Sequence, residues 1–233
     1  MGNGRLNLPA ARLIVLAAVL GVLAGGLAVY ARGGLSGNHG GSVVQPGDTV
    51  AAGGDDGGVC PAKAALAKAL GDSATGEVAA MLPADPPQSL GFLGFAGPDG
   101  KPMTLADRAG KTLLVNLWAT WCAPCRAEMP ALDALQAAKG GADFEVVAIN
   151  VDTGDDTKPK KFLAETGVKN LGYYRDASMG VFNALKERAL ALGLPVTLLV
   201  DGEGCLLAAM NGPAHWSGPD AAKLIDAALK PKS

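Results

Sequence analysis

Short apolar runs alternate with helical segments along most of this chain, and this alternation constrains its fold more than any other feature. Largely apolar runs typical of buried strands lie at Leu113–Trp118, Phe144–Val151 and Val196–Val200. Apolar spacing near 3.6 residues predicts the helices between and after them. Strands interleaved with helices predict a central mixed sheet covered on both faces, which is an α/β fold. The helices are expected over residues 122–138, 158–165, 179–190 and 221–229.

An N-terminal layer and two turn sequences complete this pattern. Cys60–Leu82 predicts a helix in two pieces, broken at Gly71-Asp72-Ser73. The turn signals Pro98-Asp99-Gly100 and Gly202-Glu203-Gly204 each separate two strand-like runs, so we expect a hairpin at each of them. Leu171–Arg175 is a further candidate strand. In the helix over 122–138, the buried face is expected to carry Ala127, Met129, Leu132 and Leu135.

The N-terminal region predicts a membrane anchor followed by a linker. Leu13–Ala31 has 19 uncharged residues, which as a helix span roughly 28 Å, close to the thickness of the bilayer core. Arg5 and Arg12 precede this run, so residues 1–12 are expected to stay cytoplasmic and the rest to be exported. The alternative is a signal peptide cleaved after Val29-Tyr30-Ala31. Residues 32–58 contain ten glycines and predict a flexible linker.

The charge distribution argues against a nucleic-acid-binding protein. Three arginines are the only charges in the first 47 residues, whereas residues 33–233 carry 17 Lys and Arg against 22 Asp and Glu. Nucleic-acid binding requires a basic surface, and this part of the chain is mildly acidic. Two histidines in the whole sequence also leave little room for a His-rich metal site or a Ser-His-Asp triad.

Cys122 and Cys125 form a C-x-x-C motif between a predicted strand and a predicted helix. The first turn of a helix presents unpaired N–H groups and the positive end of the helix dipole, and both stabilise a thiolate. Pro124 suits that turn because it has no N–H that needs a partner. The thiolate is the nucleophile of thiol–disulfide exchange, so the motif predicts a redox-active dithiol. Half of a zinc site is the alternative, but the chain lacks a second close cysteine pair and a histidine at finger spacing.

Two longer motifs frame the dithiol. Trp118-Ala119-Thr120-Trp121-Cys122-Ala123-Pro124-Cys125 surrounds it, and Gly193-Leu194-Pro195 directly precedes a predicted strand. These motifs resemble the active-site turn and the cis-proline loop of thioredoxin-fold proteins. Five further motifs extend the match: Gly76-Glu77-Val78-Ala79-Ala80-Met81, Val115-Asn116-Leu117-Trp118, Arg126-Ala127-Glu128-Met129-Pro130, Gly204-Cys205 and Gly212-Pro213-Ala214. Together they resemble the membrane-anchored TlpA family of bacterial thiol–disulfide oxidoreductases, over about residues 60–229.

This resemblance implies a thioredoxin fold over residues 59–233, with an N-terminal helical and hairpin extension and an inserted β-α segment at residues 153–176. It also implies that Pro195 is cis and lies against the disulfide, and that the backbone of Leu194 pairs with an extended substrate chain. Trp121 is expected to shield the nucleophile and to contact substrate. Val196 departs from the threonine common in the TlpA motif, so docking of the peptide backbone there differs.

Glu128 is the candidate proton acceptor. Related extracytoplasmic reductants carry a glutamate at its position, and thioredoxin itself carries an aspartate where this chain has Asn116. Helix geometry places Glu128 on the face next to Cys125, three residues earlier. Burial that raises the pKa of the carboxyl toward the working pH enables it to accept the proton of Cys125. The alternative is an exposed charge on a helix.

Cys60 and Cys205 remain after the C-x-x-C pair. The resemblance implies that they form a structural disulfide, which ties the N-terminal helix to the terminal hairpin. The alternative is two free buried thiols. An even number of cysteines fits an oxidising compartment.

The remaining polar candidates are interpreted as surface residues. Asp152, Asp155 and Asp156 follow a predicted strand and are expected in a solvated loop, and His215 is expected at the surface. The sequence therefore predicts no metal site and no cofactor.

The resemblance implies a periplasmic reductant of client-protein disulfides, tethered to the inner membrane by its N-terminal helix and recharged by a membrane electron-donor protein. Relatives specialised for cytochrome c usually have Gly-Val-x-Gly-x-Pro-Glu-Thr before and after the cis-proline. Here the stretch is Leu192-Gly193-Leu194-Pro195-Val196-Thr197, which favours clients in copper-site assembly of cytochrome oxidase. One alternative is a reductant of apocytochrome c thiols, and another is a copper-binding chaperone that uses the two thiols and His215.

Overall fold

Between residues 59 and 229, which the computed structural model describes, the strands form one mixed sheet in the order β1-β8-β7-β4-β5-β6-β2-β3. At its centre lies β4 (Thr112–Trp118), a strand whose residues are all buried. It runs parallel to β5 (Phe144–Asn150) and antiparallel to β7 (Val196–Val200). The predicted α/β class, the central mixed sheet and these three strands are therefore confirmed.

The remaining strands are short or lie toward the edges of the sheet. β8 (Leu206–Asn211) pairs antiparallel with β7, and β1 (Leu82–Pro83) pairs with β8 at one edge. At the other edge, β6 (Tyr174–Arg175) pairs with β2 (Gly94–Ala96), and β2 pairs with β3 (Pro102–Thr104). Both predicted hairpins are present. The N-terminal extension thus contributes strands to opposite edges of the sheet, which the sequence pattern did not indicate.

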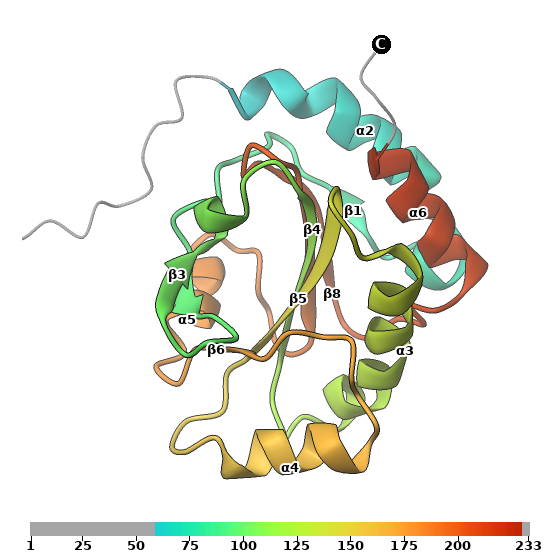
Figure 1. Cartoon of the computed structure of the whole chain (residues 1–233). Coiled ribbons are helices and arrows are strands. Elements are labelled where there is room, and N and C mark those ends of the chain that lie inside the picture. Colours follow the sequence, from blue (N-terminus) through green and yellow to red (C-terminus); the bar gives the residue numbers. More distant parts are fainter. Residues whose placement is uncertain (1–58, 230–233) are drawn as a thin grey trace, which may run out of the picture. The chain divides into compact units, whose positions relative to one another are not determined.

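The α-helices cover the sheet much as the sequence predicts, but the expected helix over Cys60–Leu82 is wrong in part. Its first piece continues through the expected break at Gly71-Asp72-Ser73, and its second piece is only a short 3-10 turn. In Figure 1, α3 (Ala123–Lys139) and α6 (Pro219–Leu229) lie on one side of the central strands, and α5 (Gly180–Glu187) lies on the other. α2 (Ala64–Ser73) contacts β8 and α6. Short 3-10 turns complete the described elements: η1 (Pro61–Lys63), η2 (Gly76–Val78) and η3 (Leu105–Arg108).

Three of the four residues predicted for the buried face of α3 are buried in the structure. Met129, Leu132 and Leu135 are buried as expected, but Ala127 is exposed. The buried stripe begins at Cys125 and continues through Glu128 and Met129, at the three- and four-residue steps of a helix. Position 127 lies outside that stripe, and a polar side chain, Glu128, takes the inward place.

The inserted segment at residues 153–176 forms α4 (Thr157–Glu165) and β6. β6 pairs in parallel with the end of β5, and Asp133 of α3 fastens the loop between α4 and β6. One Asp133 oxygen accepts the backbone N–H groups of residues 169, 170 and 171 at 2.6–3.1 Å. The predicted strand over Leu171–Arg175 is shorter than expected, and its first residue, Leu171, donates its N–H to Asp133 and not to a neighbouring strand.

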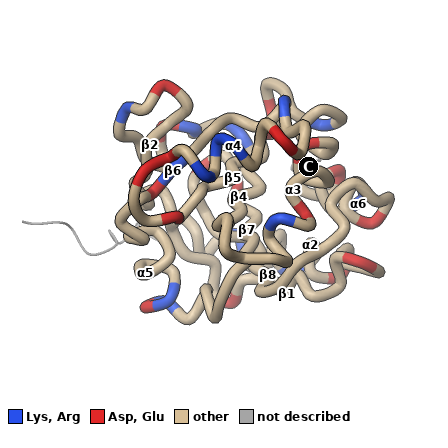
Figure 2. The backbone as a smooth tube through the Cα atoms, turned by 90° about the horizontal axis from the view of Figure 1, so that it is seen from below, with Lys and Arg blue, Asp and Glu red and all other residues tan. Residues whose placement is uncertain are grey.

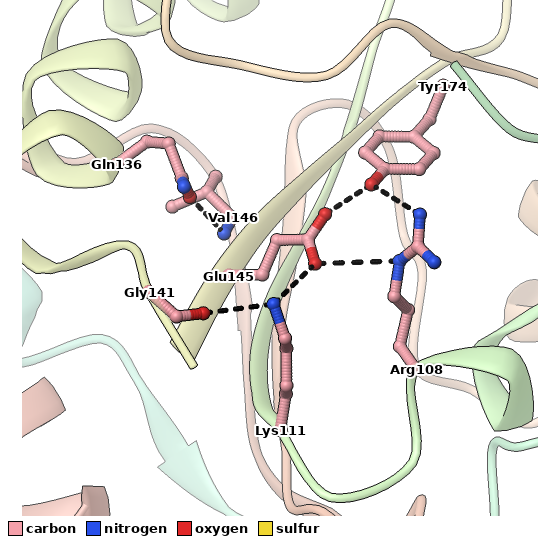
Figure 3. A network of polar contacts seen from close by, with 7 residues as sticks. All are labelled: Arg108, Lys111, Gln136, Gly141, Glu145, Val146 and Tyr174. Atoms are coloured by element: carbon pink, nitrogen blue, oxygen red, sulfur yellow. Dashed lines mark hydrogen bonds and ion pairs between the residues drawn. The ribbon is translucent and has the colours of Figure 1, made fainter. Parts of the chain in front are cut away.

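A polar network joins the N-terminal extension to the sheet on the β6 side (Figure 3). Glu145 at the start of β5 accepts a hydrogen bond from the hydroxyl of Tyr174 and forms ion pairs with Arg108 and Lys111, at 3.5 and 3.6 Å. Arg108 Nη2 also donates to the Tyr174 hydroxyl at 3.2 Å. Burial, together with the hydrogen bond to Glu145, raises the pKa of Tyr174 to about 12. The network fixes η3, β5 and β6 relative to one another.

The predicted cytoplasmic tail, membrane anchor and linker (residues 1–58) lie outside the described residues. Among residues 59–229, no helix combines the length and the apolar character needed to cross a bilayer.

Candidate functional site

The C-x-x-C motif lies where β4 ends and α3 begins. Cys122 is the N-cap residue of α3, and its Sγ accepts the backbone N–H of Cys125 at 3.2 Å. The two cysteines are joined by a disulfide. Cys122 is 6 % exposed and Cys125 is fully buried. Of the two cysteines, only Cys122 therefore keeps some contact with solvent.

The sheet register brings the proline loop to the same end of the molecule. Leu117 of β4 pairs with Val196 of β7, so the residues that follow β4 lie beside the residues that precede β7. The Leu194–Pro195 peptide bond is cis, as the resemblance implied. Pro195 is buried and Leu194 is half-buried. The backbone of residue 194 is thus placed beside the disulfide-bearing turn.

Asn211 of β8 fixes the outer part of this loop. Its side-chain oxygen accepts the N–H of Leu192 at 2.7 Å, and its amide donates to the carbonyl of Leu190 at 3.1 Å. Leu192 is 83 % exposed. The other large exposed apolar residue at this end is Trp121, which is 64 % exposed and directly precedes Cys122. Trp121 is therefore available for substrate contact, whereas Trp118 is buried against Phe162.

Glu128 lies inside the protein, only 4 % exposed. Its Oε1 accepts from Asn116 Nδ2 at 2.9 Å, and its Oε2 accepts from the Ala214 N–H and from Trp216 Nε1, both at 3.1 Å. Burial raises the pKa of Glu128 above its ordinary value, and these three hydrogen bonds offset part of the increase. The alternative of an exposed helix charge is wrong. A buried carboxyl with a raised pKa, on the helix that carries both cysteines, is suited to hold and release a proton.

A groove opens beside this carboxyl. It has a volume of about 500 Å³ and lies between α3 and the segment that follows β8. His215 and Glu77 stand in its lining, with His215 Nδ1 2.9 Å from Glu77 Oε2. His215 is exposed, as the sequence analysis expected. Glu128 also contributes to the lining, which gives the buried carboxyl a path to solvent. The other lining residues are Pro124, Ala127, Ala131, Pro213 and Ala214.

Cys60 and Cys205 are joined by a second disulfide that closes a separation of 145 residues. Cys60 precedes η1, and Cys205 precedes β8. Both residues are buried. This bond ties the N-terminal helical layer to the terminal hairpin, on the elements to which the resemblance assigned it.

Two polar clusters near the dithiol did not emerge from the sequence analysis. The first is the pair Asn116 and Thr197 on neighbouring strands, where Asn116 Nδ2 donates to Thr197 Oγ1 at 2.9 Å as well as to Glu128. The sequence did carry a signal for this pair, because each of the two residues is a polar side chain within an otherwise largely apolar strand. The second is Asp152, expected in a solvated loop but only 7 % exposed. That expectation is wrong because its carboxylate binds the turn before Cys122.

No group of three or more His, Cys, Asp or Glu side chains within residues 59–229 is arranged to hold a metal ion. Basic and acidic residues are mixed over the side of the molecule seen in Figure 2, where α4 carries several lysines. The described part of the chain presents no extended basic surface in that view.

A protein-family model described as Redoxin matches residues 92–225. The thiol:disulfide interchange protein HelX of Rhodobacter capsulatus is 41 % identical over 116 residues, which are 48 % of this chain and 59 % of that protein. The thiol-disulfide oxidoreductase ResA of Oceanobacillus iheyensis is 39 % identical over 67 residues, 29 % of this chain and 34 % of that protein. The similarity thus spans less than two thirds of either relative.

Among solved structures, a putative thiol:disulfide interchange protein DsbE from Chlorobium tepidum is 27 % identical. Its superposition covers 59 % of this chain and 92 % of that chain, with a TM-score of 0.49.

Proposed function

Since this chain belongs to the Redoxin family, we propose that it is a thiol–disulfide oxidoreductase that reduces disulfides in client proteins. One observation carries the proposal: the disulfide lies at the first turn of α3, with Cys122 reachable and Cys125 sealed inside. The relatives named as thiol–disulfide interchange proteins support the same reaction class.

Cys122 is the nucleophile in this proposal. In the reduced protein its thiolate lies at the N-terminus of α3, where the Cys125 N–H points at the sulfur. The helix dipole and this N–H both stabilise the negative charge of a thiolate at Cys122, and the thiolate is the form that attacks disulfides. Cys125 has no such access, so its sulfur reacts only with what Cys122 has already captured.

The reaction proceeds through a mixed disulfide. The Cys122 thiolate attacks one client sulfur, the client S–S bond breaks, and the second client sulfur leaves with the electron pair as a thiolate that takes up a proton. Cys125 then loses its proton and attacks Cys122 Sγ, which releases the first client sulfur as a thiolate. The client gains two electrons and two protons, and the protein is left with the Cys122–Cys125 disulfide.

Glu128 receives the proton of Cys125 in the second step. Its raised pKa suits it to exchange a proton with a thiol. The groove of about 500 Å³ along α3 connects it to solvent, where the proton is released. Asn116, Ala214 and Trp216 hold the carboxyl in place throughout.

The client chain docks at the cis-proline loop. An extended segment pairs with the backbone of Leu194, next to Pro195, while Trp121 covers the segment from the other side of Cys122. The exposed indole of Trp121 supports this role.

The finer assignment follows the TlpA-like motifs. We propose a periplasmic domain held at the inner membrane by residues 13–31, with residues 32–58 as a tether that raises its effective concentration near a membrane electron donor. The sequence at Leu192–Thr197 favours clients of copper-site assembly in cytochrome oxidase. Apocytochrome c is the alternative client. A copper chaperone using the dithiol and His215 is the alternative function.

A trapping experiment tests the proposal. Cys125→Ser removes the resolving thiol, so a client should remain covalently bound to Cys122 in cell-envelope extracts and be released by reductant. Cys122→Ser is the matched control and should trap nothing. Mass spectrometry of the trapped species identifies the client class. A wild-type protein that fails to reduce any protein disulfide contradicts the reductase assignment. If that protein binds Cu(I) and loses the binding in His215→Ala, the result favours the chaperone.

A further inference from the structure

A carboxylate from a different part of the chain holds the turn that leads into the dithiol. Asp152 lies in the loop after β5, 32 residues after Thr120. Its Oδ2 accepts the backbone N–H of Thr120 at 2.9 Å, and its Oδ1 accepts the Thr120 hydroxyl at 2.8 Å. Both carboxylate oxygens are therefore bound to the same residue of the turn.

Asp152 is itself fixed from two sides. Asn150, the last residue of β5, donates from Nδ2 to Asp152 Oδ2 at 2.7 Å. Arg175, in β6 of the inserted segment, donates from Nη2 to the carbonyls of Asp152, Gly154 and Asp155 at 3.3, 2.5 and 3.1 Å. With 7 % exposure, the carboxylate is largely shielded from water, and hydrogen bonds to a buried charge are stronger than those at a surface.

The anchored turn is short, so fixing Thr120 fixes the nucleophile. Cys122 follows two residues later, and its N–H donates to the carbonyl of Ala119 at 3.1 Å. The carbonyl of Trp118, just before the turn, accepts the N–H of Val151 at 2.9 Å. The backbone is thus held on both sides of Thr120, and the position of Cys122 Sγ over the first turn of α3 depends on these contacts.

We infer that Asp152 is a positioning residue for thiol exchange at Cys122. It holds Thr120, and the inserted segment holds Asp152 through Arg175, so the insertion acts as a support for the active-site turn. The catalytic importance of this role rests on the proposed function. Its physical content, the placement of the Cys122 sulfur against the N–H groups of α3, is independent of any client.

The test measures the alkylation rate of Cys122 by iodoacetamide in the reduced full-length protein, across the pH range in which the thiol ionises. Mass spectrometry of peptides distinguishes Cys122 from Cys125. Thr120→Val removes the hydroxyl that donates to Asp152 and leaves the Asp152 carboxylate unchanged. Thr120→Ser keeps both the hydroxyl and the carboxylate. Asp152→Ala removes both hydrogen bonds. Asp201→Ala is the matched control, because Asp201 is similarly buried and accepts the N–H groups of Glu203 and Cys205 beyond the end of β7 that lies away from this turn.

Loss of one such hydrogen bond is expected to slow alkylation near neutral pH about threefold to tenfold in Thr120→Val, and loss of both more than about tenfold in Asp152→Ala. Thr120→Ser and Asp201→Ala should match the wild type. Thr120→Val and Thr120→Ser both leave the Asp152 carboxylate in place. If alkylation slows in Thr120→Val and not in Thr120→Ser, the cause is therefore the lost hydrogen bond that positions the turn. This comparison also serves if Asp152→Ala fails to fold.

The inference is overturned if Thr120→Val alkylates at the wild-type rate, if Asp152→Ala alkylates faster than the wild type, or if Asp201→Ala slows as much as Asp152→Ala. A different result is that the wild-type protein reduces no protein disulfide while alkylation still slows in Thr120→Val and slows further in Asp152→Ala. That result refutes the proposed function and leaves this inference standing.

Discussion

Removal of the Cys60–Cys205 disulfide should destabilise the domain strongly. The bond closes a separation of 145 residues, and the chain-entropy relation for a loop of this length gives about 5 kcal/mol at 25 °C. Measured values for native disulfides commonly fall somewhat below this relation, so we expect a loss of about 3–5 kcal/mol. For a domain of this size, the melting temperature should drop by about 6–20 °C.

The measurement needs a background without the redox-active pair. In Cys122→Ser/Cys125→Ser protein, the further change of Cys60 and Cys205 to Ala isolates the structural bond. Urea unfolding followed by circular dichroism gives the free energy of unfolding of both proteins, and the slope with urea shows whether the denatured state has expanded. Added reductant should destabilise the background protein and leave the variant without cysteines unchanged.

A loss below about 1 kcal/mol would refute the reasoning. Such a result means that the N-terminal layer stays docked on β8 and α6 through packing alone, and that the unfolded chain is not significantly constrained by the bond. The same small loss would be seen if the Cys60–Cys205 bond had not formed in the background protein. Titration of free thiols in that protein, without added reductant, detects this directly.

Three further changes test other parts of the structure. Because burial raises the pKa of Glu128, ionisation of this carboxyl opposes folding. The free energy of unfolding of the wild type should fall as the pH rises from the ordinary pKa of a carboxyl through the raised one. Glu128→Gln should lack this fall when the free energy of unfolding is measured against pH. Asp133→Asn should cost about 1.5–3 kcal/mol, and limited proteolysis should cut faster at residues 169–171, which its carboxylate binds. Glu145→Ala removes the acceptor of the Tyr174 hydroxyl and the carboxylate partner of Arg108 and Lys111 and should cost about 2–3 kcal/mol in urea unfolding; an unchanged midpoint would show that the network adds nothing.

The strand, the dithiol and the helix at the site were predictable because their signals are local. An apolar run, a C-x-x-C motif with Pro124, and helical spacing lie consecutively in the sequence. The cis-proline loop required the resemblance, since an X-Pro bond is rarely cis by propensity alone. Its position beside the dithiol then follows from the antiparallel pairing of β4 with β7.

The polar contacts that surround the dithiol were not predictable, because they join distant residues. Asp152 has the local sequence of a solvated acidic loop, and only the packing of the insertion places its carboxylate on Thr120. The partners of Glu128 likewise come from β4 and from residues 86 and 88 positions later. Helix geometry alone could place Glu128 near Cys125 but could not show that three donors would enclose it.

The depth at which Cys60 and Cys205 are buried has a chemical consequence. Exchange requires in-line approach of a thiolate to a sulfur, and neither of these sulfurs admits one while the domain is folded. The reduced Cys122 thiolate therefore cannot scramble the second bond, and a reductant that recharges the catalytic pair leaves it oxidised. If the proposed function holds, the Cys122–Cys125 bond is reduced and re-formed in every reaction, while the Cys60–Cys205 bond stays oxidised until the molecule unfolds.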